Sequence, residues 1–166
     1  MSRTAEPVIV TIDAGFQRWD ELLALIHDSF AYMQGVVDPP ASGLALTAAA
    51  LRAKALSETG LIALAGGRIV GCAFVSPRED HLYLGKLAVA RDLQGCGIGR
   101  LLVSHAEALA RAAGKPALQL QTRIELTGNH KAFARLGFVE TARTAHPGHD
   151  RPTSVTMRKA LAGGAG

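Results

Sequence analysis

The sequence predicts an α/β fold of the α+β type, built as one domain over residues 1–162. The chain has 166 residues, a length that one domain usually accounts for. Strand-like and helix-like segments alternate along it, and a strand, a glycine-rich loop and a helix follow one another between Leu82 and Leu102. The last residues, 163–166, include three glycines and are expected to form a flexible tail.

The first half of the chain is predicted to contain three strands and two helices. β-Branched side chains near the N-terminus favour a strand, and apolar residues at helical spacing favour the helices. Prolines and glycine between Asp38 and Gly43 separate the helices, and the Gly66–Gly67 pair favours a hairpin turn. The expected segments are a strand over 8–12, helices over 15–35 and 47–57, and hairpin strands over 61–65 and 68–75.

The central unit begins with residues 82–89, an apolar run with little strict alternation, which is typical of a strand covered on both faces. The loop from Gln94 to Gly99 contains three glycines. A helix follows and is expected to end at Gly114, a C-terminal glycine stop. One face of this helix is expected to be buried, formed by Ile98, Leu101, Leu102, Leu109 and Ala112.

The glycine loop is a candidate phosphate site. Glycines let the backbone approach a ligand closely, and the first turn of a helix carries unpaired N–H groups and a partial positive charge. The spacing excludes a P-loop, which needs Gly-Lys-Ser/Thr where Arg100–Leu101 stands, and a GxGxxG fingerprint would need a third glycine at Arg100. The alternative is a glycine loop that only turns the chain.

The last third of the chain is predicted to add three strands and a short helix. Gly137 closes the helix, and a loop with two prolines separates the final two strands. The expected segments are a strand over 117–122, a helix over 131–136, and strands over 138–141 and 154–159.

The pattern Gln94-x-x-Gly97-x-Gly99, preceded by Leu87–Ala88–Val89, resembles the acetyl-coenzyme-A signature of the GNAT superfamily of N-acetyltransferases. The amphipathic helix that follows and the later Arg135–Leu136–Gly137–Phe138 strengthen this resemblance, which covers nearly the whole chain. It implies an acyl-CoA N-acyltransferase fold, with a mixed central sheet splayed at the cofactor site and helices on both faces.

The resemblance also implies a function. The expected activity is transfer of the acetyl group of acetyl-CoA to a primary amine of a small molecule or protein, by direct attack in a ternary complex. Asn129 is expected either to reach the cofactor or to cap its helix. The cofactor-binding residues that the resemblance implies are Leu87, Ala88, Val89, Gln94, Gly95, Cys96, Gly97, Ile98, Gly99, Arg100, Asn129 and Phe133.

Two side chains of the central strand are candidate catalytic groups. His81 falls where histone-type members of the resembled family carry a catalytic glutamate, and an imidazole titrates near neutrality. Tyr83 shares its strand face and offers a phenol, whereas Phe133 stands where many members carry the tyrosine that protonates the thiolate. The alternative is that His81 is a solvated residue, and Glu79 and Asp80 are weaker candidates.

The walls of the acceptor site are expected at two variable segments. Tyr32 and Met33 lie at the end of the first helix, and His146 lies in the loop before the last strand. His146, His149 and Asp150 also form a small cluster of candidate metal ligands, but a surface loop is the preferred interpretation and no metal is expected. A thiol at a helix N-terminus can be a nucleophile, yet no histidine or acid has an evident place beside Cys96.

The composition argues against nucleic-acid binding and against a membrane-spanning protein. The net charge of +4 comes without a block of basic residues, so no nucleic-acid partner is expected. No 18-residue apolar run predicts a membrane span, and two cysteines without a disulfide pattern suit a cytoplasmic protein. A homodimer is compatible with the resemblance. Two alternative functions remain: a non-catalytic acyl-CoA-binding or sensing module, and a zinc hydrolase built on the His146–Asp150 loop.

Overall fold

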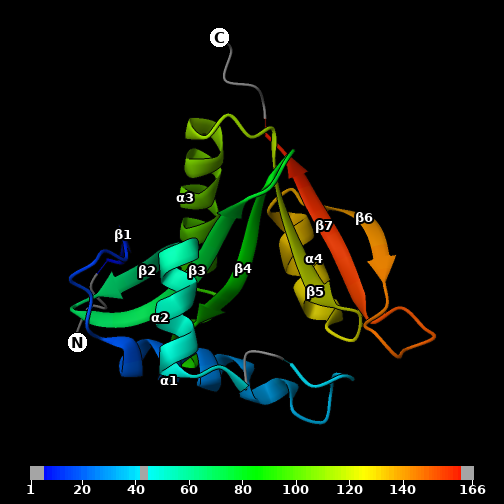
Figure 1. The fold of residues 1–166 in the computed structure, drawn as a ribbon, viewed down its shortest axis with the longest axis horizontal. Coiled ribbons are helices and arrows are strands. Elements are labelled where there is room, and N and C mark those ends of the chain that lie inside the picture. Colours follow the sequence, from blue (N-terminus) through cyan, green and yellow to red (C-terminus); the bar gives the residue numbers. More distant parts are fainter. Residues whose placement is uncertain (1–5, 42–44, 162–166) are drawn as a thin grey trace.

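The computed structural model describes residues 6–41 and 45–161. It consists of a seven-stranded mixed sheet with α-helices on both of its faces (Figure 1). The elements are β1 (Val8–Thr11), α1 (Trp19–Phe30), the 3₁₀ helix η1 (Ala31–Met33), α2 (Ala48–Ser57), β2 (Thr59–Ala65), β3 (Arg68–Pro77), β4 (Leu82–Val89), the 3₁₀ helix η3 (Arg91–Leu93), α3 (Ile98–Ala112), β5 (Ala117–Arg123), α4 (Thr127–Arg135), β6 (Val139–Thr144) and β7 (Ser154–Ala160).

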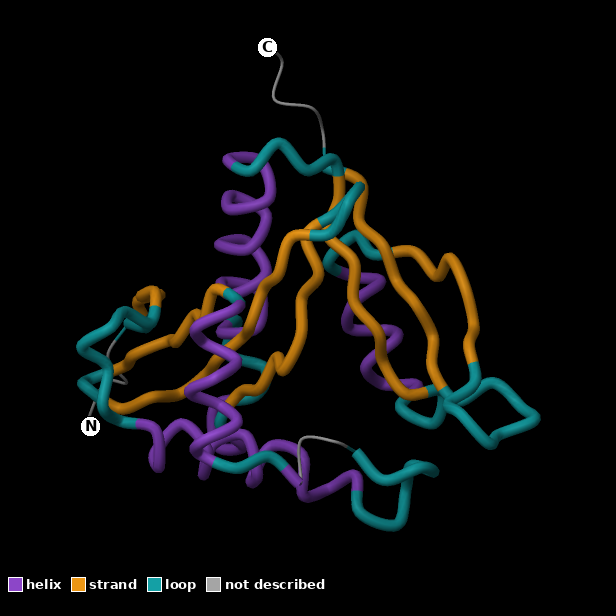
Figure 2. The backbone as a smooth tube through the Cα atoms, in the orientation of Figure 1, coloured by secondary structure: helices purple, strands orange, loops and turns teal. Residues whose placement is uncertain are grey.

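The sheet opens near its middle, between β4 and β5. The strand order is β1-β2-β3-β4-β5-β7-β6, and β4 and β5 are the parallel pair. They pair only at Leu82 with Leu118 and at Tyr83 with Gln119, after which the strands separate (Figure 2). The predicted mixed sheet with a splay is therefore confirmed. The splay leaves the β5-facing edge of β4 without a strand partner beyond Tyr83.

Helices α1 and α2 cover one face of the sheet, and α3 and α4 cover the other (Figure 1). The centre of the core contains Phe74 of β3 with Leu22 and Ile26 of α1, all fully buried. Helix α3 packs closely against β3 at Gly71. A Cβ added there would lie only 2.8 Å from the Ile98 side chain, so the close approach requires glycine. These contacts hold the N-terminus of α3 beside the end of β4.

The buried face of α3 differs from the predicted one. Leu101 is 40% exposed and Ala112 is exposed, so their assignment to the core was wrong. Four of the buried residues follow a four-residue spacing instead, and Val103 is buried beside them: Ile98, Leu102, Ala106 and Ala110. Small alanines allow the helix to lie near the sheet, and a pattern based on large apolar residues alone does not detect them.

The helix boundaries also refine the prediction. α1 begins at Trp19 rather than at Gly15. Gly15 lies in the preceding turn, where its N–H donates a hydrogen bond to the Asp13 carboxylate at 3.0 Å. α4 begins at Thr127, earlier than the predicted residue 131. Asn129 therefore lies inside α4 and is not its cap, because the N-cap position is Leu126.

The strand β4 is half-exposed on one face, contrary to the prediction that both faces are covered. Leu82, Leu84 and Ala88 are buried, whereas the residues between them are partly exposed because they face the splay. The helices of the described ranges are all too short or too polar to cross a membrane. The predicted tail, 163–166, falls outside the described residues.

Candidate functional site

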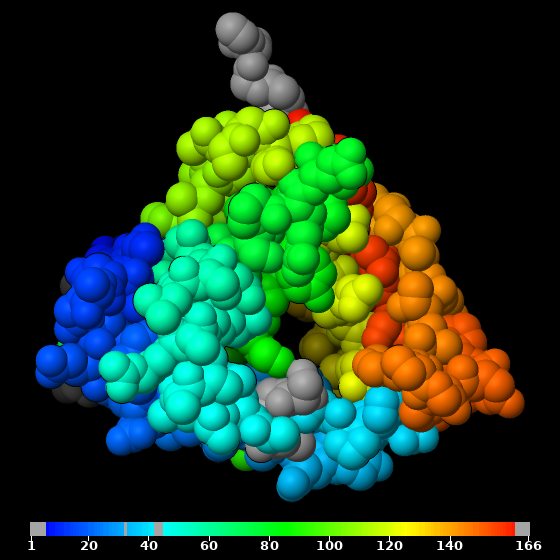
Figure 3. All heavy atoms as spheres, viewed as in Figure 1, coloured from blue at the N-terminus to red at the C-terminus, as the bar shows by residue number. Residues whose placement is uncertain are grey.

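The splay contains two adjoining clefts. The first, which we call the glycine-loop cleft, has a volume of about 720 Å³ and lies between the end of β4, the loop 94–100 and α4. The second, the strand cleft, has a volume of about 370 Å³ and lies between β4 and β5 (Figure 3). The two clefts share lining residues, so they form one continuous depression: Phe30, Met33, Leu87, Asn129 and Phe133.

The glycine loop exposes backbone N–H groups at the first cleft. Gly97, with a φ of 88°, is the N-cap of α3 and no side chain caps the helix there. The N–H groups of the next three residues, 98–100, consequently have no partner within the helix. Gly95 also has a positive φ, of 82°, so both glycines are required by the turn itself. The loop therefore presents donors of the kind that bind phosphate oxygens.

Gly99 is not required by the protein's own structure. It lies in the first turn of α3, its φ is not positive, and a Cβ added there would meet nothing within 4 Å. Gly99 lines the glycine-loop cleft, so a ligand there can approach its backbone closely, and the uncapped N–H groups beside it are donors suited to a phosphate.

Positive charge surrounds the same cleft. Arg91, Arg100 and Arg135 line it, and no acidic residue of the described ranges does. Arg100 was predicted from the sequence as a cofactor-binding residue, whereas Arg91 and Arg135 were missed. Arg135 belongs to the Arg135–Leu136–Gly137–Phe138 motif on which the resemblance rests, so the sequence offered a signal that could have predicted it as a cofactor contact. Three guanidinium groups at this cleft favour an anionic ligand.

The end of β4 is shaped to receive an extended ligand. A bulge interrupts its pairing with β3, and Lys86 within it has a φ of 50°. The Ser29 hydroxyl donates a hydrogen bond to the carbonyl of Val89 at 3.0 Å, which fixes the last residue of the strand. The predicted Leu87, Ala88 and Val89 all line the glycine-loop cleft along the open strand edge.

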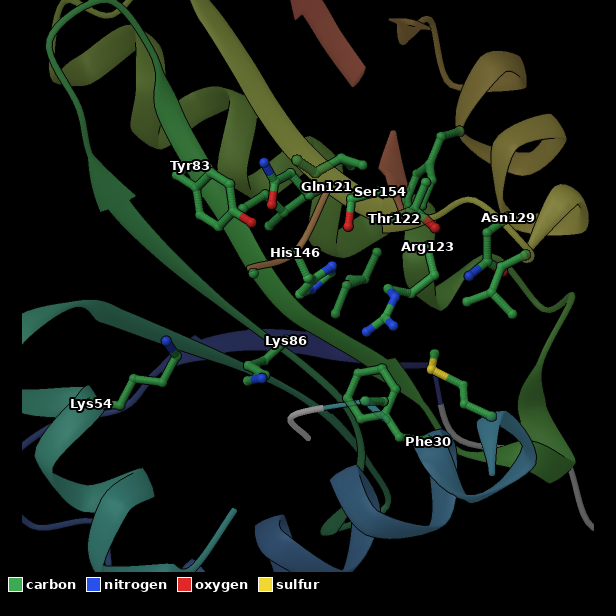
Figure 4. Close-up of a pocket in the computed structure, with 18 residues that line it drawn as sticks. Phe30, Lys54, Tyr83, Lys86, Gln121, Thr122, Arg123, Asn129, His146 and Ser154 are labelled. Atoms are coloured by element: carbon green, nitrogen blue, oxygen red, sulfur yellow. The ribbon is translucent and has the colours of Figure 1, made fainter. Parts of the chain in front are cut away.

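The strand cleft brings together polar side chains from distant segments (Figure 4). Tyr83 of β4 faces Gln121 of β5, and His146 enters from the loop before β7. Burial raises the pKa of Tyr83. Arg78, whose Cζ lies 5.3 Å from the centroid of the Tyr83 ring, lowers this pKa. The phenol is therefore protonated at neutral pH.

His146 is held in one orientation by Thr153. The hydroxyl of Thr153 accepts the backbone N–H of His146 at 2.9 Å and is within hydrogen-bonding distance of its Nδ1. The same hydroxyl donates its single proton to the carbonyl of Thr144 at 3.4 Å. We therefore assign the proton of the ring to Nδ1, which leaves a lone pair on Nε2. Burial lowers the pKa of His146, and the nearby Arg123 and His149 lower it further.

His81 lies outside both clefts. It lines a separate shallow hollow together with Tyr83, beyond the point at which β4 and β5 pair. Its Nδ1 is 2.8 Å from Asp80, whose carboxylate also contacts Arg158 at 3.4 Å. The hydrogen bond from His81 lowers the pKa of Asp80. The side chain of His81 is 13% exposed, so it is not a solvated surface residue.

The other predicted contacts are placed as follows. Met33 and Phe133 line both clefts, and the Phe133 ring packs edge to face against Phe138 at 5.8 Å. Cys96 is exposed and does not line the glycine-loop cleft. The side chain of Tyr32 lies outside the described part of the structure. Within the described ranges, no three His, Cys, Asp or Glu side chains are grouped to hold a metal ion.

Solved structures with a similar fold include acetyltransferases. The PaiA N-acetyltransferase from Thermoplasma acidophilum, in complex with coenzyme A, has a TM-score of 0.77 at 14% identity, over 93% of this chain and 99% of that one. A GNAT family acetyltransferase from Elizabethkingia anophelis with acetyl-CoA bound has a TM-score of 0.66 at 18% identity, over 93% and 98%. At these identities the likeness shows the fold.

The sequence comparison identifies the family. Residues 19–138 match the model of the acetyltransferase (GNAT) family, so this chain belongs to that family. It is 33% identical to the aminoglycoside N(6')-acetyltransferase type 1 of Stenotrophomonas maltophilia, over 52% of this chain and 62% of the relative. It is 31% identical to the IAA acetyltransferase of Azospirillum brasilense, over 61% and 67%. The first match thus spans less than two thirds of that relative.

Proposed function

We propose that this chain transfers the acetyl group of acetyl-CoA to a primary amine of a small molecule or protein, by direct attack while both substrates are bound. The observation that carries this proposal is the glycine-loop cleft, where Gly99 and the uncapped N-terminus of α3 lie beside three arginines and no acidic residue of the described ranges. The curated relatives, both named as acetyltransferases, and the GNAT family match support it.

The glycine-loop cleft would hold the donor. Backbone N–H groups of residues 97–100 would bind the pyrophosphate, with Arg91 and Arg100 nearby. The unpaired edge of β4 would hydrogen-bond the pantetheine arm, and Asn129, which lines both clefts, would orient the end of the arm. The acetyl end would then lie where the two clefts meet.

The strand cleft would hold the acceptor amine and the groups that move its protons. When bound, acetyl-CoA supplies an acetyl thioester. His146 accepts a proton from the acceptor ammonium at Nε2, since its lowered pKa keeps the ring neutral at neutral pH. Tyr83, on the strand-cleft side, would donate its proton to the sulfur of the leaving thiolate as the carbon–sulfur bond is replaced by a carbon–nitrogen bond, and the second proton lost by the nitrogen would restore the Tyr83 hydroxyl. His81 remains a weaker candidate than His146 because it lies outside the cleft.

A binding or sensing module without catalysis is the second candidate function. It is favoured by Phe133, which cannot donate a proton where many family members carry a tyrosine. Tyr83 and His146 are an argument against it, because a sensor has no need of a phenol and a neutral imidazole in the cleft beside the donor site.

The direct test is release of free thiol from acetyl-CoA with a panel of primary amines, measured beside calorimetric binding of acetyl-CoA alone. The proposal predicts binding and, with at least one amine, thiol release together with an N-acetylated product seen by mass spectrometry. Binding without amine-dependent release across the panel would favour the sensing module and contradict the proposal.

A further inference from the structure

We propose that the acceptor amine carries a carboxylate and that Arg123, assisted by Lys86, binds this group in the strand cleft. This inference rests on the proposed function and narrows it to a substrate class. It predicts discrimination against acceptors that carry several positive charges and no anion.

The charges on the wall of the strand cleft are of one sign. Lys54, Lys86 and Arg123 line it, together with the titratable Tyr83 and His146. No aspartate or glutamate of the described ranges lines this cleft. An acceptor that enters it therefore meets cations and no carboxylate, which favours an anionic partner.

Two nearby acids do not remove this imbalance. Glu58 lies behind Lys54 and pairs with it at 2.7 Å, so the charge of Lys54 is compensated. Glu125 accepts the backbone N–H of Asp38 at 3.2 Å through one oxygen, and its other oxygen is buried without a partner in the described ranges. Glu125 acts to raise the pKa of His146, so it lessens the imbalance of charge, but it does not line the cleft. Lys86 is disfavoured as a cation, because burial and the nearby Lys54 lower its pKa, with Glu58 acting in the opposite sense. A bound carboxylate would favour its protonated form.

Arg123 is the side chain with an unused donor. Its Nη2 donates to the carbonyl of Pro39, but its Nε is buried and has no hydrogen-bond partner in the described ranges. None of the ion pairs between described residues includes Arg123. Figure 4 shows its guanidinium in the middle of the cleft, between His146 and Phe30. A buried N–H without a partner is costly, and a carboxylate matches the planar geometry of the guanidinium.

The surrounding loops fix Arg123 in place. Asp38, next to Pro39, contacts Arg151 at 3.4 Å and His149 at 3.6 Å, which ties the 38–40 segment to the loop before β7. His130 of α4 lies 2.9 Å from the backbone carbonyl of Arg123. These contacts hold the Pro39 carbonyl, which binds Nη2 of Arg123, so the guanidinium is positioned before a ligand binds and less entropy is lost on binding. This arrangement also places the proposed anion site next to His146.

The test compares acceptors that differ only in the carboxylate. Initial rates of acetyl-CoA-dependent thiol release are measured for a series of α-amino acids, each beside its carboxamide, with spermidine as a polycation. We expect kcat/KM for the best amino acid to exceed that of its amide by about tenfold or more, as charge-assisted hydrogen bonds are roughly twice as strong as neutral ones. Spermidine should be the poorest acceptor.

Three variants locate the effect. Arg123→Gln should bring the ratio between acid and amide close to one, mainly through a higher KM, and Arg123→Lys should retain part of the preference. Arg52→Gln, which removes an exposed cation of α2 that does not line the cleft, is the matched control and should keep the ratio. Calorimetric binding of acetyl-CoA to each variant checks that the fold and the donor site persist.

The outcomes separate this inference from the proposed function. Efficient acetylation of amides or spermidine, equal to or better than that of the amino acids, would overturn the carboxylate while leaving the acetyltransferase in place. A preference for acids that survives unchanged in folded Arg123→Gln would overturn the role of Arg123. Thiol release with none of the amines would contradict the proposed function itself, and this inference with it.

Discussion

At the scale of single residues, the strand cleft joins a phenol that retains its proton with an imidazole that is kept neutral. Burial has opposite effects on their pKa values, because it raises the pKa of Tyr83 and lowers that of His146. In both cases it disfavours the charged form. The two groups therefore suit removal of the first proton from the acceptor ammonium and protonation of the leaving sulfur, one as base and one as acid.

His146 should control the acidic limb of the pH profile. The base acts in its neutral form, so kcat/KM falls as the pH decreases through the lowered pKa of His146, below the range of an ordinary histidine. His146→Gln should reduce kcat/KM by roughly 10²–10⁴-fold and abolish this limb. His105→Gln, on α3 and outside both clefts, is the control. An acidic limb that persists in folded His146→Gln would assign the base elsewhere, with His81 the next candidate.

Tyr83 should control the alkaline limb. The acid acts in its protonated form, so kcat declines as the pH rises through a pKa that burial places above that of a free tyrosine. Tyr83→Phe removes only the hydroxyl and should lower kcat by roughly 10²-fold or more with acetyl-CoA binding retained. If kcat of this variant matched the wild type, the leaving thiolate would have to take its proton from solvent.

At the scale of elements, α3 has two functions on different parts of its surface. Its N-terminus presents the donors of the glycine-loop cleft, and its buried face anchors it on β3. The four-residue spacing of that face was not predicted, because alanines at 106 and 110 carry little hydrophobic signal. The glycine loop, in contrast, was predicted from its sequence alone, because its closely spaced glycines mark a turn. In the structure Gly95 and Gly97 have the positive φ that this turn demands.

Adjacent leucines on α3 test the orientation of this helix. Leu102 is fully buried, so Leu102→Ala should lower the free energy of unfolding by about 2–5 kcal/mol. Leu101 is 40% exposed, and Leu101→Ala should cost less than about 1 kcal/mol. Urea denaturation of both variants measures the difference. Equal losses would mean that the helix is rotated from the described orientation.

At the scale of the whole molecule, the site depends on the way two strands part. The strand periodicity predicted that His81 and Tyr83 share one face, and both residues line the same hollow. Tyr83 pairs with Gln119, however, so β4 and β5 are joined there and His81 lies outside the strand cleft. That closure follows from tertiary pairing and leaves no sequence signal. Lys54 and Arg123 were not predicted either, because residues of α2 and of the end of β5 line one cleft only in the folded molecule.

The central claim is that the space above Gly99 belongs to the phosphates of acetyl-CoA. Gly99 and Gly128 occupy equivalent second positions of α3 and α4, both with open space around an added Cβ, but only Gly99 lines the glycine-loop cleft. Calorimetric titration of acetyl-CoA into wild type, Gly99→Glu and Gly128→Glu therefore compares the same change at a site and away from it.

Wild type and Gly128→Glu should bind acetyl-CoA alike. Gly99→Glu, with unchanged thermal stability, should lose binding, because its carboxylate occupies the phosphate position and repels the phosphates. Equal binding by folded Gly99→Glu would show that the phosphates lie elsewhere. It would contradict the assignment of the glycine-loop cleft.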